Sequence, residues 1–163
     1  ALKQILNGYC GFNDNYPDGL YIADENGTLI TADDSSKKDS DPTSSVWYKD
    51  GLTRVNMGFT DAYTNEDGDA VISVSGILND GSDTLKVISA DLSLDRISII
   101  VNSFIEMDDA QAFLVNPKDG SILAHRDSSM ISTNLSDSSD AFLKDAAQFF
   151  DRKPVERDRG MVK

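Results

Sequence analysis

The chain has little of the chemistry that most catalytic and metal sites require. Its 163 residues include one cysteine, Cys10, and one histidine, His125. A single cysteine cannot close an intrachain disulfide, and one Cys with one His cannot assemble a Cys/His zinc site. The acidic turns that end at Gly27 and Gly68 lack the first oxygen ligand of a calcium loop, so no metal site is predicted. No nucleophile elbow or phosphate-binding glycine loop occurs, so the sequence indicates neither an enzyme nor a cofactor.

Positive charge is also scarce. The chain carries 28 Asp and Glu against 15 Lys and Arg, for a net charge of −13. Nucleic acids and anionic membrane surfaces are bound largely through Lys and Arg, so this balance argues against both as partners. No apolar run is long enough to cross a bilayer, and any membrane attachment is expected only through flanking helices. Because ALKQIL reads as the end of a helix, we expect a fragment of a longer protein.

What the chain does contain is a series of short strands joined by tight turns. Asn26-Gly27 favours a hairpin turn, since Asn and Gly accept positive φ angles. Alternation of apolar and small polar residues predicts a half-buried strand over residues 70–77. The full set of predicted strands covers residues 20–23, 28–32, 58–63, 70–77, 85–92, 110–115 and 121–125. An antiparallel meander is therefore expected.

Four helical segments are predicted between these strands. Residues 1–6 are the helix tail, which a turn-rich connection with Gly8 and Gly11 follows. A short helix is expected over residues 49–55. Apolar residues at three- and four-residue steps predict a third helix that begins near Ser93, its N-cap, and ends at Asp108-Asp109. Ala141–Phe150 is the fourth.

One strand–turn–strand pattern occurs twice. Leu20–Ile30 and Ala112–Leu123 each combine an apolar strand ending in Asp or Asn, a turn with glycine, and Thr or Ser before two aliphatic residues. The two turn glycines, Gly27 and Gly120, lie 120 − 27 = 93 residues apart. This spacing suits two related modules in tandem, although a protein rich in hairpins can also show one such echo by chance.

Two features stand out as candidates for a site. Trp47, the single tryptophan, adjoins Tyr48 and follows the long polar run Asp33–Ser45. Such a pair either closes the edge of a core or forms the wall of a small-molecule pocket. Asp91 lies in an otherwise apolar strand, where a carboxylate needs a cation or several donors. It is either an N-cap for the following helix or an acceptor for a ligand's ammonium group.

In their order along the chain, these segments resemble the double Cache (dCache) sensor domain of bacterial transmembrane receptors, of the methyl-accepting chemotaxis type. Ala112–Asp127 resembles the opening of that family's membrane-proximal module. The segments that carry the main resemblance are Tyr21–Gly27, Trp47–Asp50, Gly68–Ser75 and Ser89–Asp95.

The resemblance implies an α+β fold: PAS-like antiparallel sheets with flanking helices, in two tandem modules of which the second is incomplete. Residues 1–95 would form the membrane-distal module, and residues 96–163 a linker helix and part of the proximal one. It also implies an extracytoplasmic location on a membrane-anchored receptor and a small-molecule ligand in the distal module. Chemotaxis is the expected output, with a histidine kinase or diguanylate cyclase as alternatives, and a homodimer is expected in the full receptor.

The same resemblance assigns candidate ligand-binding residues. Amino-acid-binding members carry Arg-x-Trp-Tyr, a Tyr five residues before the Arg, and a late Asp for the ligand's ammonium group. Trp47, Tyr48 and Asp91 match this pattern, and Tyr63 lies near a further pocket tyrosine. Ser45 stands at the Arg position and Ser40 at the earlier Tyr position.

This departure bears on the kind of ligand. Serine cannot supply the bidentate, charged contact that a guanidinium gives a carboxylate. The ligand is therefore expected to be an amine, an amino acid or another small metabolite, with the amine or a neutral solute favoured over an α-amino acid. A module that binds a partner protein through the loop Asp33–Ser45 is the alternative.

Overall fold

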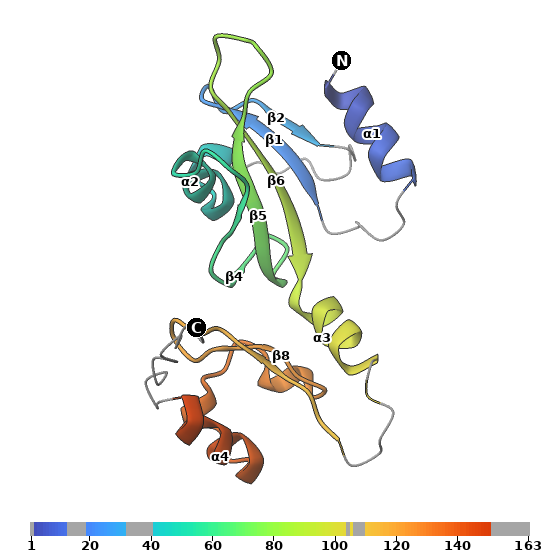
Figure 1. Ribbon diagram of the computed structural model, residues 1–163. Coiled ribbons are helices and arrows are strands. Elements are labelled where there is room, and N and C mark those ends of the chain that lie inside the picture. The colour runs from blue at the N-terminus through green and yellow to red at the C-terminus, as the bar shows by residue number, and fades with distance from the viewer. Residues whose placement is uncertain (1, 13–18, 32–40, 104, 106–109, 151–163) are drawn as a thin grey trace, which may run out of the picture. The chain divides into compact units, whose positions relative to one another are not determined.

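The computed structural model describes residues 2–12, 19–31, 41–103, 105 and 110–150 (Figure 1). The chain divides into two compact units, Ala1–Ile97 and Ser98–Lys163. Helices and antiparallel strands occur in both, so the fold is α+β, as predicted.

The first unit is built on a six-stranded antiparallel sheet. Its order is β2-β1-β6-β5-β3, and β4 also pairs with β5. The strands are β1 (Leu20–Asp24), β2 (Leu29–Thr31), β3 (Gly58–Phe59), β4 (Tyr63–Thr64), β5 (Ala70–Leu78) and β6 (Lys86–Ser93). The helices of this part of the chain are α1 (Leu2–Phe12), α2 (Val46–Leu52) and α3 (Leu94–Ser103).

Two predicted hairpin turns form because a side chain closes each of them. Oδ1 of Asp24 accepts the backbone N–H groups of Asn26 and Thr28, both at 2.9 Å, and Gly27 takes the positive φ of 81° that the turn requires. Oδ1 of Asn65 likewise accepts the N–H groups of Asp67 and Asp69, at 3.0 and 2.8 Å. The second turn places its residues directly after β4.

One face of the sheet is buried and unusually polar. In β5 and β6 the buried positions alternate, as the two-residue period of a strand requires. The register pairs Ser73 with Asp91 and Ser75 with Ser89, so these four side chains share one face. The buried aliphatic and aromatic residues on the same face include Tyr21, Ala23, Val71 and Val87.

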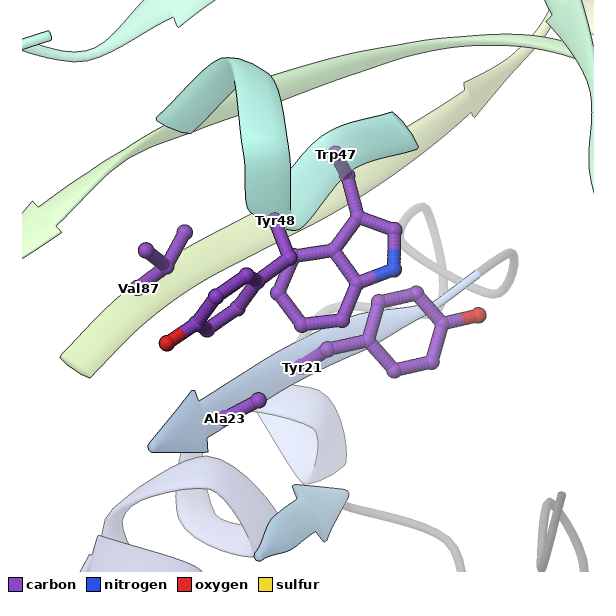
Figure 2. Packing of buried hydrophobic residues seen from close by; sticks show 5 residues of the cluster. All are labelled: Tyr21, Ala23, Trp47, Tyr48 and Val87. Carbon is purple, nitrogen blue, oxygen red and sulfur yellow. The ribbon is translucent and has the colours of Figure 1, made fainter. Parts of the chain in front are cut away.

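Helix α2 packs directly on this face (Figure 1). The helix comes close to the sheet at Gly51, where a Cβ atom would lie 2.5 Å from Cγ1 of Val87 and 3.3 Å from Cβ of Ser75. Only glycine therefore fits between this helix and β5 and β6. The close packing buries Trp47 and Tyr48 against Tyr21, Ala23 and Val87 (Figure 2).

Several predicted boundaries were wrong. The helix expected over residues 49–55 begins at Val46, because Ser45 has the extended backbone of an N-cap, and so it contains the Trp47-Tyr48 pair. Helix α1 continues through Gly8 and Gly11, since a helical glycine costs only about 1 kcal/mol.

Two predicted strands and one helix end also differ. The strand expected over residues 58–63 is split into β3 and β4, and between them Thr60 donates its N–H to the Ser73 carbonyl at 2.8 Å. The strand expected over residues 110–115 is limited to β7 (Leu114–Val115). Helix α3 is described to Ser103, and its predicted end at Asp108-Asp109 lies outside the described residues.

The second unit has a small core of its own. Strand β7 pairs with β8 (Ile122–Ala124), so both copies of the repeated pattern fold as antiparallel hairpins. Helix α4 spans Ala141–Phe150, as predicted, and Oδ1 of Asp140 accepts the N–H groups of Phe142 and Leu143 at its start. The buried core residues are Ile122, Leu135, Leu143 and Ala147.

Candidate functional site

A cavity of about 220 Å³ opens in the first unit, between the start of α2, strand β1 and the β4–β5 turn. Pockets for drug-sized molecules span about 300–1,000 Å³, so this one suits a smaller ligand. Its described walls are mostly aromatic, hydroxyl-bearing or acidic. They comprise Tyr21, Leu29, Pro42, Ser44, Ser45, Val46, Trp47, Tyr63, Thr64, Asn65, Glu66 and Asp91.

Two stacked rings form one wall of the cavity. Trp47 lies in the first turn of α2 and Tyr21 on β1, with ring centroids 5.7 Å apart and planes inclined by only 19°. Figure 2 shows the indole nitrogen of Trp47 and the phenol oxygen of Tyr21 pointing to the same side. Trp47 is only 7% exposed and also belongs to the core cluster. The two interpretations of this tryptophan, core packing and pocket wall, therefore both apply.

Tyr48 is directed elsewhere. It packs edge-on against Trp47, with centroids 5.8 Å apart, and in Figure 2 its phenol oxygen points away from that of Tyr21. The pKa of Tyr48 is raised, mainly by burial. The negative charges of Glu25, Asp24 and Asp41 raise it further. None of these acids is on the cavity wall, and neither is Tyr48. Adjacent residues of a helix point about 100° apart, which explains why only one of the pair reaches the cavity.

A hydrogen-bonded chain joins Asp91 to Tyr63. Ser73 Oγ donates to Oδ1 of Asp91 at 2.5 Å, and Tyr63 Oη lies 2.6 Å from the same Oγ. Ser73 has one hydroxyl proton and gives it to the carboxylate, so the Tyr63 hydroxyl donates to Ser73. The backbone N–H of Ser73 is held by Thr60 Oγ1 at 2.9 Å. This network fixes a carboxylate that is only 5% exposed.

Both cavity tyrosines remain neutral well above physiological pH. Burial, followed by the charge of Asp91, raises the pKa of Tyr63 to about 12. Burial is also the main reason that the pKa of Tyr21 is raised, with Asp91, Asp67 and Glu66 adding to it. The phenols therefore serve as hydrogen-bonding groups and not as charges.

Three of the four predicted ligand-binding residues lie on the wall of the same cavity. Trp47, Tyr63 and Asp91 all line the one cavity, whereas Tyr48 does not. Ser45, at the position where an arginine was expected, is itself on the wall. Ser40 lies outside the described residues.

Asp91 is not the N-cap of α3, which was one of the two roles that the sequence allowed for it. Its Oδ1 is engaged across the sheet by Ser73, while Ser93 Oγ accepts the N–H of Arg96, at 3.4 Å, in the first turn of α3. Strand alternation places the carboxylate on the buried face, and the hydrogen bond from Ser73 engages one of its oxygens there.

Three contributors to the site were missed from the sequence. Tyr21 occupies a buried strand position that reads equally well as core, and Glu66 sits in a turn where acids are common. Ser73 gave no signal, because small polar residues alternate along the whole of β5. Only the pairing of β5 with β6 places it beside Asp91.

The described residues contain no group of three or more His, Cys, Asp and Glu side chains that could hold a metal ion. Within the same residues, no helix has the length and apolar character of a membrane span.

Comparison with known proteins identifies the family. Residues 2–99 match the methyl-accepting chemotaxis protein-like first PDC sensor domain. The chain belongs to this family. The dCache resemblance is thereby confirmed for the first unit.

Individual relatives agree with this assignment. The methyl-accepting chemotaxis protein McpG of Pseudomonas putida is 33% identical over 119 residues, which are 72% of this chain and 19% of McpG. The ligand-binding domain of the Pseudomonas aeruginosa amino acid chemoreceptor PctB, solved with L-Arg, has a TM-score of 0.62 at 27% identity and covers 73% of this chain and 51% of that one. The ligand-binding domain of Mlp24, solved with asparagine, shares the fold with a TM-score of 0.64 at 22% identity, over 83% of this chain and 57% of that one. The chain thus spans about a fifth of McpG and about half of each solved domain.

Proposed function

We propose that the first unit is the ligand-sensing part of a bacterial chemoreceptor, exposed on the extracytoplasmic side of the membrane. Its cavity binds a small organic molecule through an ammonium group placed at Asp91. The observation that supports this best is the meeting of a buried carboxylate with three aromatic rings in one cavity of sensor-domain fold. The residues that carry it are Tyr21, Trp47, Tyr63 and Asp91.

The chemistry of these side chains favours an ammonium ligand. A carboxylate taken out of water costs several kcal/mol unless a cation and donors meet it, and Ser73 supplies one donor to Oδ1. The ammonium group of a ligand is attracted to the same carboxylate. Trp47 and the tyrosines add cation–π attraction, which is worth about 0.5–2 kcal/mol per ring, most at tryptophan.

The relatives support the same class of function. McpG is named as a methyl-accepting chemotaxis protein, and the ligand-binding domains of PctB and Mlp24 were solved with L-Arg and asparagine. No catalytic step is placed in this unit, because a sensor needs only a ligand that prefers one of two conformations.

Calorimetric titration of the purified chain with a panel of small amines tests the proposal. Trp47 is the single tryptophan, so its fluorescence gives an independent readout from inside the cavity. At least one amine is expected to bind and to change that emission, and Asp91→Asn is expected to weaken its binding at least about tenfold, as loss of a buried ionic partner should.

Asp83→Asn is the matched control, since it removes the same charge from an exposed turn residue that does not line the cavity. Its affinity should equal that of the wild type. Equal affinity of wild type and Asp91→Asn for every amine that binds would refute the role of Asp91.

Three expectations remain predictions. The kinase or cyclase output and the homodimer concern parts of the receptor outside this chain. The assignment of the two units as membrane-distal and membrane-proximal modules also stays a prediction. The loop that would contact a partner protein, Asp33–Ser45, lies mostly outside the described residues.

A further inference from the structure

We propose that the ligand of this cavity presents an uncharged hydrogen-bond acceptor to the indole N–H of Trp47 and the hydroxyl of Ser45, at the start of α2. The ligand class is therefore a small amino amide or amino ketone, and not an amino acid. This inference rests on the function proposed above and specifies the second end of its ligand.

Trp47 carries a buried hydrogen-bond donor without a partner in the described part of the chain. The side chain is only 7% exposed, and no described residue accepts a hydrogen bond from its indole nitrogen. An indole N–H can only donate, and it usually finds an acceptor when its side chain is buried. A ligand in the cavity can supply that acceptor.

This donor is accessible from the cavity. Trp47 and Tyr21 both line the cavity, and Figure 2 shows the indole nitrogen and the phenol oxygen pointing to the same side of the stacked rings. Among the described side chains, the unpartnered polar atoms that are fully enclosed are the hydroxyls of Ser75 and Ser89. The indole nitrogen is not one of them, so a small molecule can reach it.

Ser45 brings a second donor to the start of the same helix, two residues before Trp47. It is the N-cap of α2, but its side chain makes no capping hydrogen bond, and it lines the cavity. A serine at this position ordinarily accepts a hydrogen bond from an N–H group of the first turn. Because its hydroxyl is not used in this way, Ser45 and Trp47 together offer a ligand two neutral donors.

The charges around these donors disfavour a carboxylate. None of the described lining residues is Lys, Arg or His, so none of them offsets the cost of taking a carboxylate out of water. Tyr21 is stacked on Trp47, and negative charges act on its phenol. They raise its pKa in addition to burial, the largest cause, and include those of Asp91, Asp67 and Glu66. A further anion is repelled there, whereas an amide or ketone oxygen accepts the same hydrogen bonds without a charge.

The test compares three ligands with one carbon skeleton: an amino amide, the amine that lacks the amide group, and the amino acid, in matched sets of several chain lengths. Calorimetry on the whole chain near neutral pH measures each affinity. At the best chain length the amide should bind about fivefold more tightly than the amine, as one net hydrogen bond allows. The amino acid should bind most weakly of the three.

Variants that remove one donor each assign the effect to the start of α2. Trp47→Phe keeps an aromatic ring and removes the N–H, and Ser45→Ala removes a hydroxyl that caps nothing. Each should lower the amide-to-amine affinity ratio at least about twofold. If Trp47→Phe does not fold, Ser45→Ala and the ligand series on the wild type decide.

Two further variants provide a reversal and a control. Ser45→Lys adds a cation to the wall and should favour the amino acid over the amide. Tyr48→Phe is the matched control for Trp47→Phe, because it removes a polar atom from the next position of the same helix, which does not line the cavity. It should keep the wild-type ratio.

The outcomes separate this inference from the function on which it rests. If the amine binds through Asp91 and the amide binds no better at any chain length, the acceptor is refuted and the amine sensor stands. An amino acid that binds more tightly than the amide refutes the uncharged acceptor as well. If the amide binds but Asp91→Asn leaves its affinity unchanged, the role of Asp91 fails and the contact with Trp47 stands. If none of the three ligands binds, both proposals fail.

Discussion

Ser73 donates its hydroxyl proton to Asp91, 2.5 Å away and directly opposite on the neighbouring strand. Ser73 is not on the cavity wall, but Tyr63 is. The Oγ atom of Ser73 also accepts a hydrogen bond from the Tyr63 hydroxyl. A fully buried serine thus positions two cavity residues at once. It is a positioning residue, which acts on a ligand only through its neighbours.

We expect Ser73→Ala to lower both stability and ligand affinity. The substitution removes the donor to a buried carboxylate and the acceptor of a half-buried phenol, which should cost about 1–3 kcal/mol of unfolding free energy. Urea denaturation measures the first effect and calorimetry with an amine the second. An unchanged affinity in a folded variant would show that the network has no part in binding.

Ser75→Ala provides the contrast on the same strand and the same face. Ser75 is as deeply buried as Ser73, but its hydroxyl, like that of Ser89 opposite it, has no hydrogen-bond partner among the described residues. Removing an unsatisfied hydroxyl relieves a desolvation cost, so Ser75→Ala and Ser89→Ala should be neutral or stabilise by up to about 2 kcal/mol. If Ser75→Ala lowered the unfolding free energy as much as Ser73→Ala does, side-chain volume and not hydrogen bonding would determine stability at this face.

Gly51→Ala should destabilise the first unit although alanine is the better helix former. The new Cβ atom would lie 2.5 Å from Cγ1 of Val87, so the helix must shift, at a cost of about 1–3 kcal/mol. Gly8→Ala in α1 is the matched control, because nothing lies within 4 Å of its Cβ position, and it should stabilise by about 0.5–1 kcal/mol. Thermal denaturation of both variants measures the difference. Equal changes in the stability of the two variants would argue against close packing of α2 on the sheet at Gly51.

Alkaline titration of the wild type and of Tyr63→Phe should reveal the late ionisation of Tyr63. Its pKa is raised from 10.0 to about 12, mainly by burial, so the folded chain holds this proton longer than the unfolded chain does. The associated stability is fully present below about pH 10 and is lost as the pH rises to about 12. Compared with wild type, Tyr63→Phe should lose stability less steeply over that interval, and its tyrosinate absorbance should lack a late ionisation. A Tyr63 that ionises near pH 10 would contradict its burial beside Asp91.

The hairpins were predictable from the sequence because their causes are local. Asp24, Asn65 and the glycines near them close their turns through atoms only two to four residues away. Strand periodicity in β5 and β6 is local too, and it marked Asp91 as a carboxylate on a buried face.

Only some of the residues that line the cavity could be predicted from the sequence, because the lining depends on which strands and helices lie side by side in the fold. Trp47 and Tyr48 are neighbours in the chain, but their side chains point in different directions because consecutive residues of α2 are rotated by about 100° around the helix axis. Tyr21 reaches the cavity because β1 pairs with β6, and Ser73 reaches Asp91 through the pairing of β5 with β6. Pairings between strands far apart in the chain are not contained in either segment alone.

Strand β6 ends at Ser93 and helix α3 begins at Leu94, so no loop separates them. Asp91 therefore lies 94 − 91 = 3 residues from the helix on one continuous run of regular backbone. The chain has no spare length there to absorb a movement. Any shift of the Asp91 main chain would therefore reach the first turn of α3 without an intervening loop.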